Sequence, residues 1–146
     1  MIALMLVAVL VQATPVPQHL PTISVHAPHA MLTLQLATTE QERETGLMSV
    51  THLPAHTGMV FVFDQDAPVT FWMKDTLVSL DMVFVAADGT VRSVAANVPV
   101  VPKDTPNDKI PTRPGVAKYV IELPAGEARK DGIVPNVKLS EIADLH

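Results

Sequence analysis

The spacing of hydrophobic and polar positions along the chain predicts a structure made mostly of β-strands. Residues 31–37 place Leu32, Leu34 and Leu36 on one face with polar residues between them, which is the pattern of a half-buried strand. The other strands are predicted where short apolar or alternating runs are bounded by glycine, proline or polar residues. The predicted strands are residues 31–37, 59–63, 69–73, 80–86, 90–97, 119–123 and 137–142. Because no long helix separates them, the pattern favours antiparallel pairing in a compact β-sandwich or a partly open barrel.

Short helices are predicted in two of the connections. Thr39 and Glu42 have the spacing of a capping box and Gly46 follows, so residues 40–45 are predicted to form a short helix. Residues 124–129 are predicted to form a second helical turn. The fold class is therefore mainly β with one or two short helices.

The connections also include one tight turn and one long loop. The dipeptide Asp88-Gly89 tolerates positive φ, so it predicts a tight hairpin between its flanking strands. Residues 98–114 contain five prolines and no strand pattern. This segment is longer than most connections, so it is predicted to be either a functional loop or a mobile one.

The first residues have the pattern of an export signal. Residues 1–11 are almost wholly apolar and are too short to cross a bilayer, which takes roughly 20 residues, so residues 1–13 are predicted to be a signal peptide cleaved after Ala13. The segment lacks the usual Lys or Arg, so a first core strand is the alternative. Residues 14–28 are predicted to be a proline-rich tether and residues 29–146 a single β-rich domain. These predictions place the protein in the periplasm or another extracytoplasmic space, with membrane contact only through an uncleaved N-terminal segment.

Composition excludes several classes of function. The 146 residues carry a formal net charge of −5 with no basic run, which argues against nucleic acid as a partner. Cysteine is absent, so disulfides, thiolate metal sites and cysteine nucleophiles are excluded. Neither a nucleophile elbow nor a phosphate-binding glycine loop is present. No cofactor is expected, and no reaction can be assigned from the residues.

Five charged residues form a candidate site: Arg43, Lys74, Asp75, Asp81 and Glu122. Asp81 precedes an apolar run, and a carboxylate there needs a cation or several hydrogen-bond donors. In a functional interpretation Asp81 and Glu122 are paired carboxylates, and the basic residues orient an anionic or polyhydroxylated ligand. In a structural interpretation Asp81 forms a buried ion pair with Arg43 or Lys74.

Trp72 is the only tryptophan and stands between Phe71 and Met73. An aromatic ring could stack on a sugar or a peptide side chain. A large aromatic residue in an apolar strand more often fills the core. The sequence therefore predicts that Trp72 is buried, with an aromatic ligand contact as the alternative.

No metal site is predicted. His52 and His56 are four residues apart, but Pro54 between them disfavours the helix that would align their imidazoles. His26 and His29 fall in or next to the predicted tether, where we expect them to be solvated. Four methionines could offer thioethers to copper(I), but their apolar neighbours indicate core positions. These methionines are Met48, Met59, Met73 and Met82.

Several short segments resemble the domain of unknown function 192 (DUF192) family. The segments are Gly46-Leu47-Met48, residues 58–63, residues 71–76, Leu80-Asp81, Asp88-Gly89 and residues 119–126. They occur in order and at the expected spacings between about residue 32 and about residue 139. The resemblance implies a small β-rich domain, often behind a signal or membrane segment in bacteria and archaea. It brings no established biochemical activity.

The chain departs from this family in three places. Asp75 and Ser79 stand where the family usually has Asn and Pro, and a Gly-Asp pair is missing near residues 136–137. Asp75 adds a carboxylate beside Lys74, and the loss of proline at Ser79 loosens a turn that the family stiffens.

Three functions remain open at the level of sequence. The first is a binding or accessory module of the cell envelope that meets a glycan, peptide or protein through Arg43, residues 71–81 and residues 98–114. The second is a hydrolase in which Asp81 and Glu122 divide the acid and base roles. The third is a purely structural domain.

Overall fold

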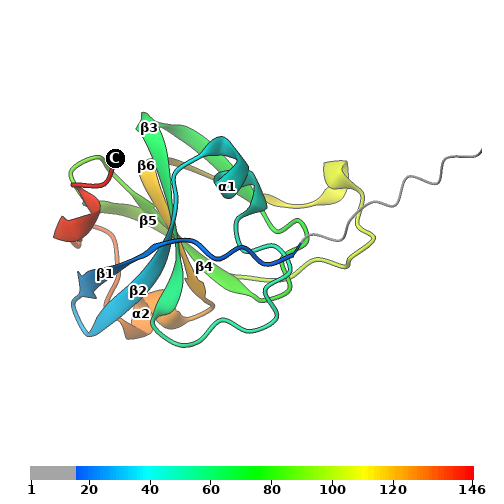
Figure 1. The fold of residues 1–146 in the computed structure, drawn as a ribbon, viewed down its shortest axis with the longest axis horizontal. Helices are drawn as coiled ribbons and strands as arrows, with labels where there is room; N and C mark the ends of the chain where they lie inside the picture. The colour runs from blue at the N-terminus through cyan, green and yellow to red at the C-terminus, as the bar shows by residue number, and fades with distance from the viewer. Residues whose placement is uncertain (1–15) are drawn as a thin grey trace, which may run out of the picture.

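The computed structural model describes residues 16–146, which form a curved, mixed sheet of six strands (Figure 1). The strands are β1 (Thr22–Ala27), β2 (Ala30–Ala37), β3 (Thr57–Trp72), β4 (Leu80–Val85), β5 (Val91–Val98) and β6 (Thr112–Pro124). Their order in the sheet is β1-β2-β3-β6-β4-β5. The helices are α1 (Glu40–Thr45) and α2 (Glu127–Lys130), with 3-10 turns η1 (Asn107–Lys109) and η2 (Ser140–Ile142). The predicted mainly β fold is confirmed, and the sheet is open, with β1 and β5 at its edges.

The capping box predicted for the first helix is present. The Thr39 hydroxyl accepts a hydrogen bond from the Glu42 amide, and the Glu42 carboxylate accepts one from the Thr39 amide. Gly46 ends α1 with φ of 48°. These contacts satisfy amides that a helix start otherwise leaves without partners.

Two strands, β3 and β6, are longer than predicted, and β3 also differs in direction. β6 begins at Thr112, inside the segment 98–114 for which no strand was predicted. β3 unites the two strands predicted at residues 59–63 and 69–73, with a register shift between Val62 and Ala67. β3 runs parallel to β2, although antiparallel pairing was predicted throughout. The connection over residues 38–56, which includes α1, is long enough to return the chain to the same end of the sheet.

The two ends of the domain also differ from the prediction. Part of the predicted tether forms β1, which pairs antiparallel with β2 and buries Val25. Its prolines, Pro21 and Pro28, flank the strand, so they do not interrupt the ladder. The strand predicted at residues 137–142 is instead a single bridge between Thr90 and Lys138 followed by η2. The predicted signal peptide lies outside the described residues. Within residues 16–146 no helix has the length and hydrophobicity needed to cross a membrane.

The sheet carries a hydrophobic core on each face. The first core includes side chains from β2, β4 and β6 together with Ala128 of α2 and Ile142 of η2. The second core includes Leu47, which follows α1, and the buried methionines Met59, Met73 and Met82. Along β6, Tyr119, Ile121 and Leu123 belong to the first core, whereas Val120 belongs to the second. Because side chains alternate along a strand, Glu122 of β6 points to the second core.

Candidate functional site

Glu122 is a buried carboxyl group on an apolar face of the sheet. It lies in register with Met59 of β3 and Met82 of β4, and only 5% of its surface is exposed. Within residues 16–146 its carboxyl has no hydrogen bond or ion pair. Burial raises the pKa of Glu122 to about 8, so the group is mostly protonated at neutral pH.

A glycine allows the backbone to come close to Glu122. A Cβ atom on Gly58 would lie 1.9 Å from the carbonyl oxygen of Glu122, which is far inside van der Waals contact. The start of β3 therefore requires glycine where it packs against β6, which explains why Gly58 precedes the apolar run of β3.

A small cavity of about 40 Å³ lies beside Glu122. This volume suits a small polar group, since roughly 10–15 Å³ of such space is enough to hold one water molecule. α1 and the turn after it, the two halves of β3 and the turn after β3 form its walls. The lining residues are Arg43, Glu44, Thr45, Gly46, Leu47, Met48, Phe61, Phe71, Trp72, Lys74, Thr76 and Glu122.

Arg43 of α1 is held in place by backbone carbonyls and an aromatic ring. Its Nη1 donates to the carbonyl oxygens of Thr38, at 2.6 Å, and Val62, at 2.8 Å. Its guanidinium carbon lies 5.2 Å from the ring centroid of Phe63. Because a guanidinium has five N–H donors, these contacts leave further donors on a side chain that lines the cavity.

Lys74 lies over the ring of Trp72 in the turn that follows β3. The Nζ atom is 5.3 Å from the ring centroid. Trp72 is 41% exposed, so the prediction that it is buried is wrong. Beyond the register shift, the outward positions of β3 are Thr70 and Trp72, while Phe71 packs against the second core. The tryptophan therefore forms part of an open rim next to a cation.

A larger groove adjoins the small cavity and shares Lys74 and Thr76 with it. Its volume is about 500 Å³. One wall is the loop that precedes β6, which the sequence analysis identified as long and rich in proline. The groove is lined by Ser49, Lys74, Asp75, Thr76, Leu77, Val100, Val101, Pro102, Lys103, Thr105, Asn107 and Ile110.

Asp75 lines this groove and not the small cavity. Its φ is 51°, a left-handed conformation that Asn adopts more readily than most residues. The structure thus gives a backbone reason for the family preference for Asn at this position.

Asp81 lies on the other face of the sheet and is fully buried. Its carboxylate accepts hydrogen bonds from the backbone amides of Asn97 (2.8 Å), Gly126 (3.0 Å) and Ala128 (3.0 Å). The structure does not pair it with Arg43 or Lys74, because Asp81 lies in register with Leu123, a residue of the first core. Three backbone donors take the place of a cation, and Asp81 ties β5 and the start of α2 to β4.

Of the residues singled out from the sequence, the structure brings Arg43, Lys74, Glu122 and Trp72 to one cavity. Asp75 lies next to it and Asp81 does not reach it. Sequence reasoning missed Thr76, a buried residue shared by the cavity and the groove. Three more residues, His56, Glu127 and Asp131, form a separate group that was not predicted. The sequence pattern that could have indicated it is the four-residue spacing of Glu127 and Asp131.

Two solved structures are similar to this chain. A proposed transcription regulator from Sinorhizobium meliloti is 35% identical, with a TM-score of 0.69, over 82% of this chain and 93% of that chain. A protein of unknown function from Novosphingobium aromaticivorans is 31% identical, with a TM-score of 0.68, over 86% of this chain and 91% of that chain. No curated protein matches the chain.

The family model that matches is DUF192, described as "Uncharacterized ACR", over residues 22–140. The match starts at β1 and ends at η2, so it covers the whole sheet. It confirms the resemblance that the short segments indicated. The chain belongs to the DUF192 family.

Proposed function

We propose that this domain is a binding module that captures the anionic group of a ligand in the cavity beside Glu122. One observation carries the proposal: the buried carboxyl of Glu122, whose pKa burial raises to about 8, shares this cavity with Arg43 and Lys74. Neither basic side chain forms an ion pair within residues 16–146. The lining of the cavity therefore presents two cationic side chains, while its acidic side chains are the exposed Glu44 and the buried Glu122, whose burial disfavours the ionised form.

The chemistry of these groups suits an anion. A protonated carboxyl donates a hydrogen bond, whereas an ionised one only accepts. The guanidinium and the ammonium group also donate only, and charge-assisted hydrogen bonds to a carboxylate are stronger than neutral ones. Together the three side chains can surround a small group such as a carboxylate.

The neighbouring groove supports a ligand with a larger body. The small cavity has room only for a head group, while the groove offers about 500 Å³ and includes the apolar side chains of Leu77, Val100 and Ile110. A ligand bound by its anionic group at Lys74 can extend into the groove, because Lys74 lines both spaces. A peptide with a free carboxyl terminus and an acidic sugar share this head-group chemistry, and the experiment below distinguishes them.

The position of Asp81 weakens the hydrolase hypothesis. Asp81 and Glu122 point to opposite faces of the sheet, so they cannot act as acid and base in one cleft. A purely structural role is also less favoured, because an unpaired buried carboxyl lowers stability without contributing to packing. Ligand binding would account for a buried carboxyl at Glu122.

We also propose that the domain works outside the cytoplasm, in the periplasm or cell envelope. The support is the short apolar segment at residues 1–13 and the small residues before the expected cleavage point. Intact-mass analysis of protein recovered from the envelope should show a start near Thr14, and a start at Met1 in a membrane fraction would oppose cleavage. The net charge of −5 supports partners other than nucleic acid.

Trp72 provides the readout for a binding experiment, because it is the only tryptophan and lines the cavity. The probes are two matched pairs: N-acetyl-leucyl-valine against its C-terminal amide, and glucuronate against glucose. We expect the acidic member of one pair to change the Trp72 fluorescence in a saturable manner and its neutral partner to have no such effect. The pair that responds identifies a peptide or a glycan as the ligand class.

A matched lysine serves as the control. Lys74→Met should abolish the response to the acidic probe, whereas Lys118→Met should keep it. Lys118 also lies over an aromatic ring, 5.2 Å from the centroid of Tyr119, but it does not line the cavity. Equal binding of acidic and neutral probes, or unchanged binding by the Lys74 variant, would rule out an anion site.

A further inference from the structure

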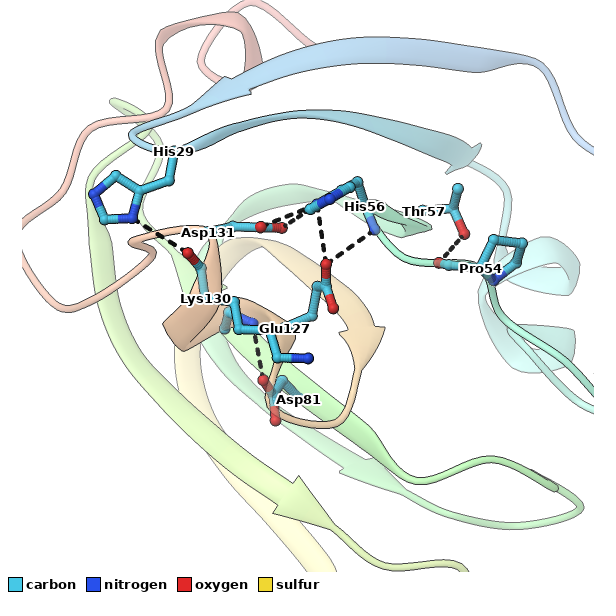
Figure 2. Close-up of polar contacts among 9 residues, drawn as sticks. His29, Pro54, His56, Thr57, Asp81, Glu127, Lys130 and Asp131 are labelled. Carbon is cyan, nitrogen blue, oxygen red and sulfur yellow. Dashed lines mark hydrogen bonds and ion pairs between the residues drawn. The ribbon is translucent and has the colours of Figure 1, made fainter.

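A second polar cluster lies away from the cavity and joins the loop before β3 to α2 (Figure 2). Figure 2 shows the His56 ring pointing toward the carboxylates of Glu127, in α2, and Asp131, just after it. The His56 Nδ1 atom is 3.0 Å from Glu127 Oε1 and 3.0 Å from Asp131 Oδ1. Its distance to Asp131 Oδ2 is 3.1 Å. One imidazole nitrogen thus faces three carboxylate oxygens.

The charges in this cluster are not balanced by protein groups. The side chains of Glu127 and Asp131 are only 6% and 2% exposed, and no Lys or Arg pairs with either within residues 16–146. Even a protonated His56 supplies a single positive charge and a single N–H at Nδ1 for two buried carboxylates. A buried carboxylate needs several hydrogen-bond donors, a paired charge or a bound cation, and within residues 16–146 the hydrogen bonds to these two come only from the amide and ring of His56. The cluster therefore has one negative charge in excess.

The geometry matches part of a metal coordination sphere. Zinc binds imidazole nitrogen and carboxylate oxygen at roughly 2.0–2.2 Å with tetrahedral angles, so neighbouring ligand atoms lie about 3.4 Å apart. The nitrogen-to-oxygen spacings of 3.0 Å are slightly shorter, so the three groups need only small shifts to take an ion between them. Glu127 and Asp131 are four residues apart, which places their carboxylates on one side of the helical turn.

The backbone also orients the histidine toward the acids. The amide of His56 donates to Glu127 Oε1 at 3.2 Å, which fixes the carboxylate beside the imidazole. The His56 side chain is 50% exposed, which gives an ion a route from solvent.

We propose that His56, Glu127 and Asp131 bind a divalent transition-metal ion, with Zn²⁺ as the best match, through His56 Nδ1 and one oxygen or more from each acid. An imidazole ligand favours zinc over calcium, which prefers oxygen ligands only. Three protein ligands leave at least one coordination position for water or an exogenous group. The ion joins the start of β3 to α2. This site is independent of the cavity beside Glu122.

Zinc binding to the chelator-treated mature protein tests the proposal. Isothermal titration calorimetry should show one Zn²⁺ per chain, and Ca²⁺ should bind much more weakly. In wild-type protein the Nδ1 resonance of His56 should shift on zinc addition in ¹⁵N-detected imidazole spectra, with the Nε2 resonance much less affected. This readout needs no variant, so it holds even where a substitution impairs folding.

A pair of histidine variants completes the test. His56→Asn should weaken Zn²⁺ binding by about 100-fold or more, since loss of a mere outer-shell partner already costs about 10–100-fold. His52→Asn removes an exposed histidine of the same loop outside the cluster and should keep wild-type affinity. Equal affinity in wild type and the His56 variant, no zinc binding, or an unchanged Nδ1 resonance would each overturn the metal site.

Discussion

Asp81 and Glu122 come from paired strands, yet their carboxyl groups lie on opposite faces of the sheet. Asp81 belongs to the face of the first core, where three backbone amides surround its carboxylate. Glu122 belongs to the face of the second core, where its carboxyl makes no hydrogen bond within residues 16–146. The two acids therefore have different roles: Asp81 is a structural anchor, and Glu122 is a buried carboxyl with a raised pKa next to a cavity.

Asp81→Asn should destabilise the domain by about 2–4 kcal/mol. The amide keeps one oxygen for Asn97 and Gly126, but its NH₂ group then faces the Ala128 amide, so two donors meet in a buried site. Urea unfolding measures the change. Asp104→Asn in the exposed loop should stay within about 0.5 kcal/mol of wild type. A similarly small effect at Asp81 would contradict the anchoring role.

Glu122 should make the stability of the protein fall as pH rises. Its pKa is 4.5 when unfolded and about 8 when folded, so the unfolded state binds fewer protons between these values. The contribution of Glu122 to the free energy of unfolding is greatest below about pH 4.5. About 5 kcal/mol of this contribution is lost by the time the pH exceeds 8.

Glu122→Gln should remove this dependence, because the amide resembles the protonated carboxyl at every pH. The variant should equal wild type near pH 4.5 and exceed it at pH 8, as measured by thermal unfolding across this range. Glu40→Gln, an exposed position, should retain the wild-type profile. Parallel pH profiles for wild type and the Glu122 variant would show that this carboxyl is ionised in the folded protein.

Trp72→Ala should cost less than about 1 kcal/mol of stability, since the ring lies at an exposed rim. Phe84→Ala removes a ring that is 1% exposed in the second core and should cost about 3–5 kcal/mol. Thermal unfolding of both variants gives the comparison. A loss for the Trp72 variant as large as that for the Phe84 variant would place the tryptophan in the core.

Arg43→Lys should destabilise the domain by about 1–2 kcal/mol, because the shorter lysine side chain does not carry its nitrogen to the position of Nη1, which donates to the carbonyls of both Thr38 and Val62. Arg113→Lys is the control, since Arg113 donates only to the carbonyl of its neighbour Thr112. Chemical denaturation measures the free energy of unfolding of both variants, and the loss should be larger for Arg43→Lys. Identical stability of both variants would mean that Arg43 does not dock α1 on β3.

Local patterns were sufficient to predict much of this fold. The capping box of Thr39 and Glu42 and the alternation along β2 depend on residues close in sequence, so the chain itself displays them. The parallel pairing of β2 with β3 was missed, because strand direction depends on how the long connection packs. β1 was missed because its flanking prolines resembled those of a linker.

The candidate site was only partly predictable for a similar reason. Charged residues next to apolar segments, such as Glu122, Lys74 and Arg43, could be identified as candidates from the sequence. Which sheet face each occupies depends on register: Asp81 was grouped with Glu122 from residue type alone, and the register separates them. The cluster of His56 with Glu127 and Asp131 joins segments about 70 residues apart, so no local pattern revealed it.

The most direct test of the central claim is the titration of the Glu122 carboxyl carbon by ¹³C NMR, with Glu122→Gln used to assign the resonance. The proposed cavity requires this carboxyl to be protonated at neutral pH beside Arg43 and Lys74. We predict a midpoint at about pH 8, as burial of the carboxyl dictates. A midpoint near the ordinary value of 4.5 would mean that Glu122 is ionised and balances the basic side chains, which would contradict the anion-binding cavity.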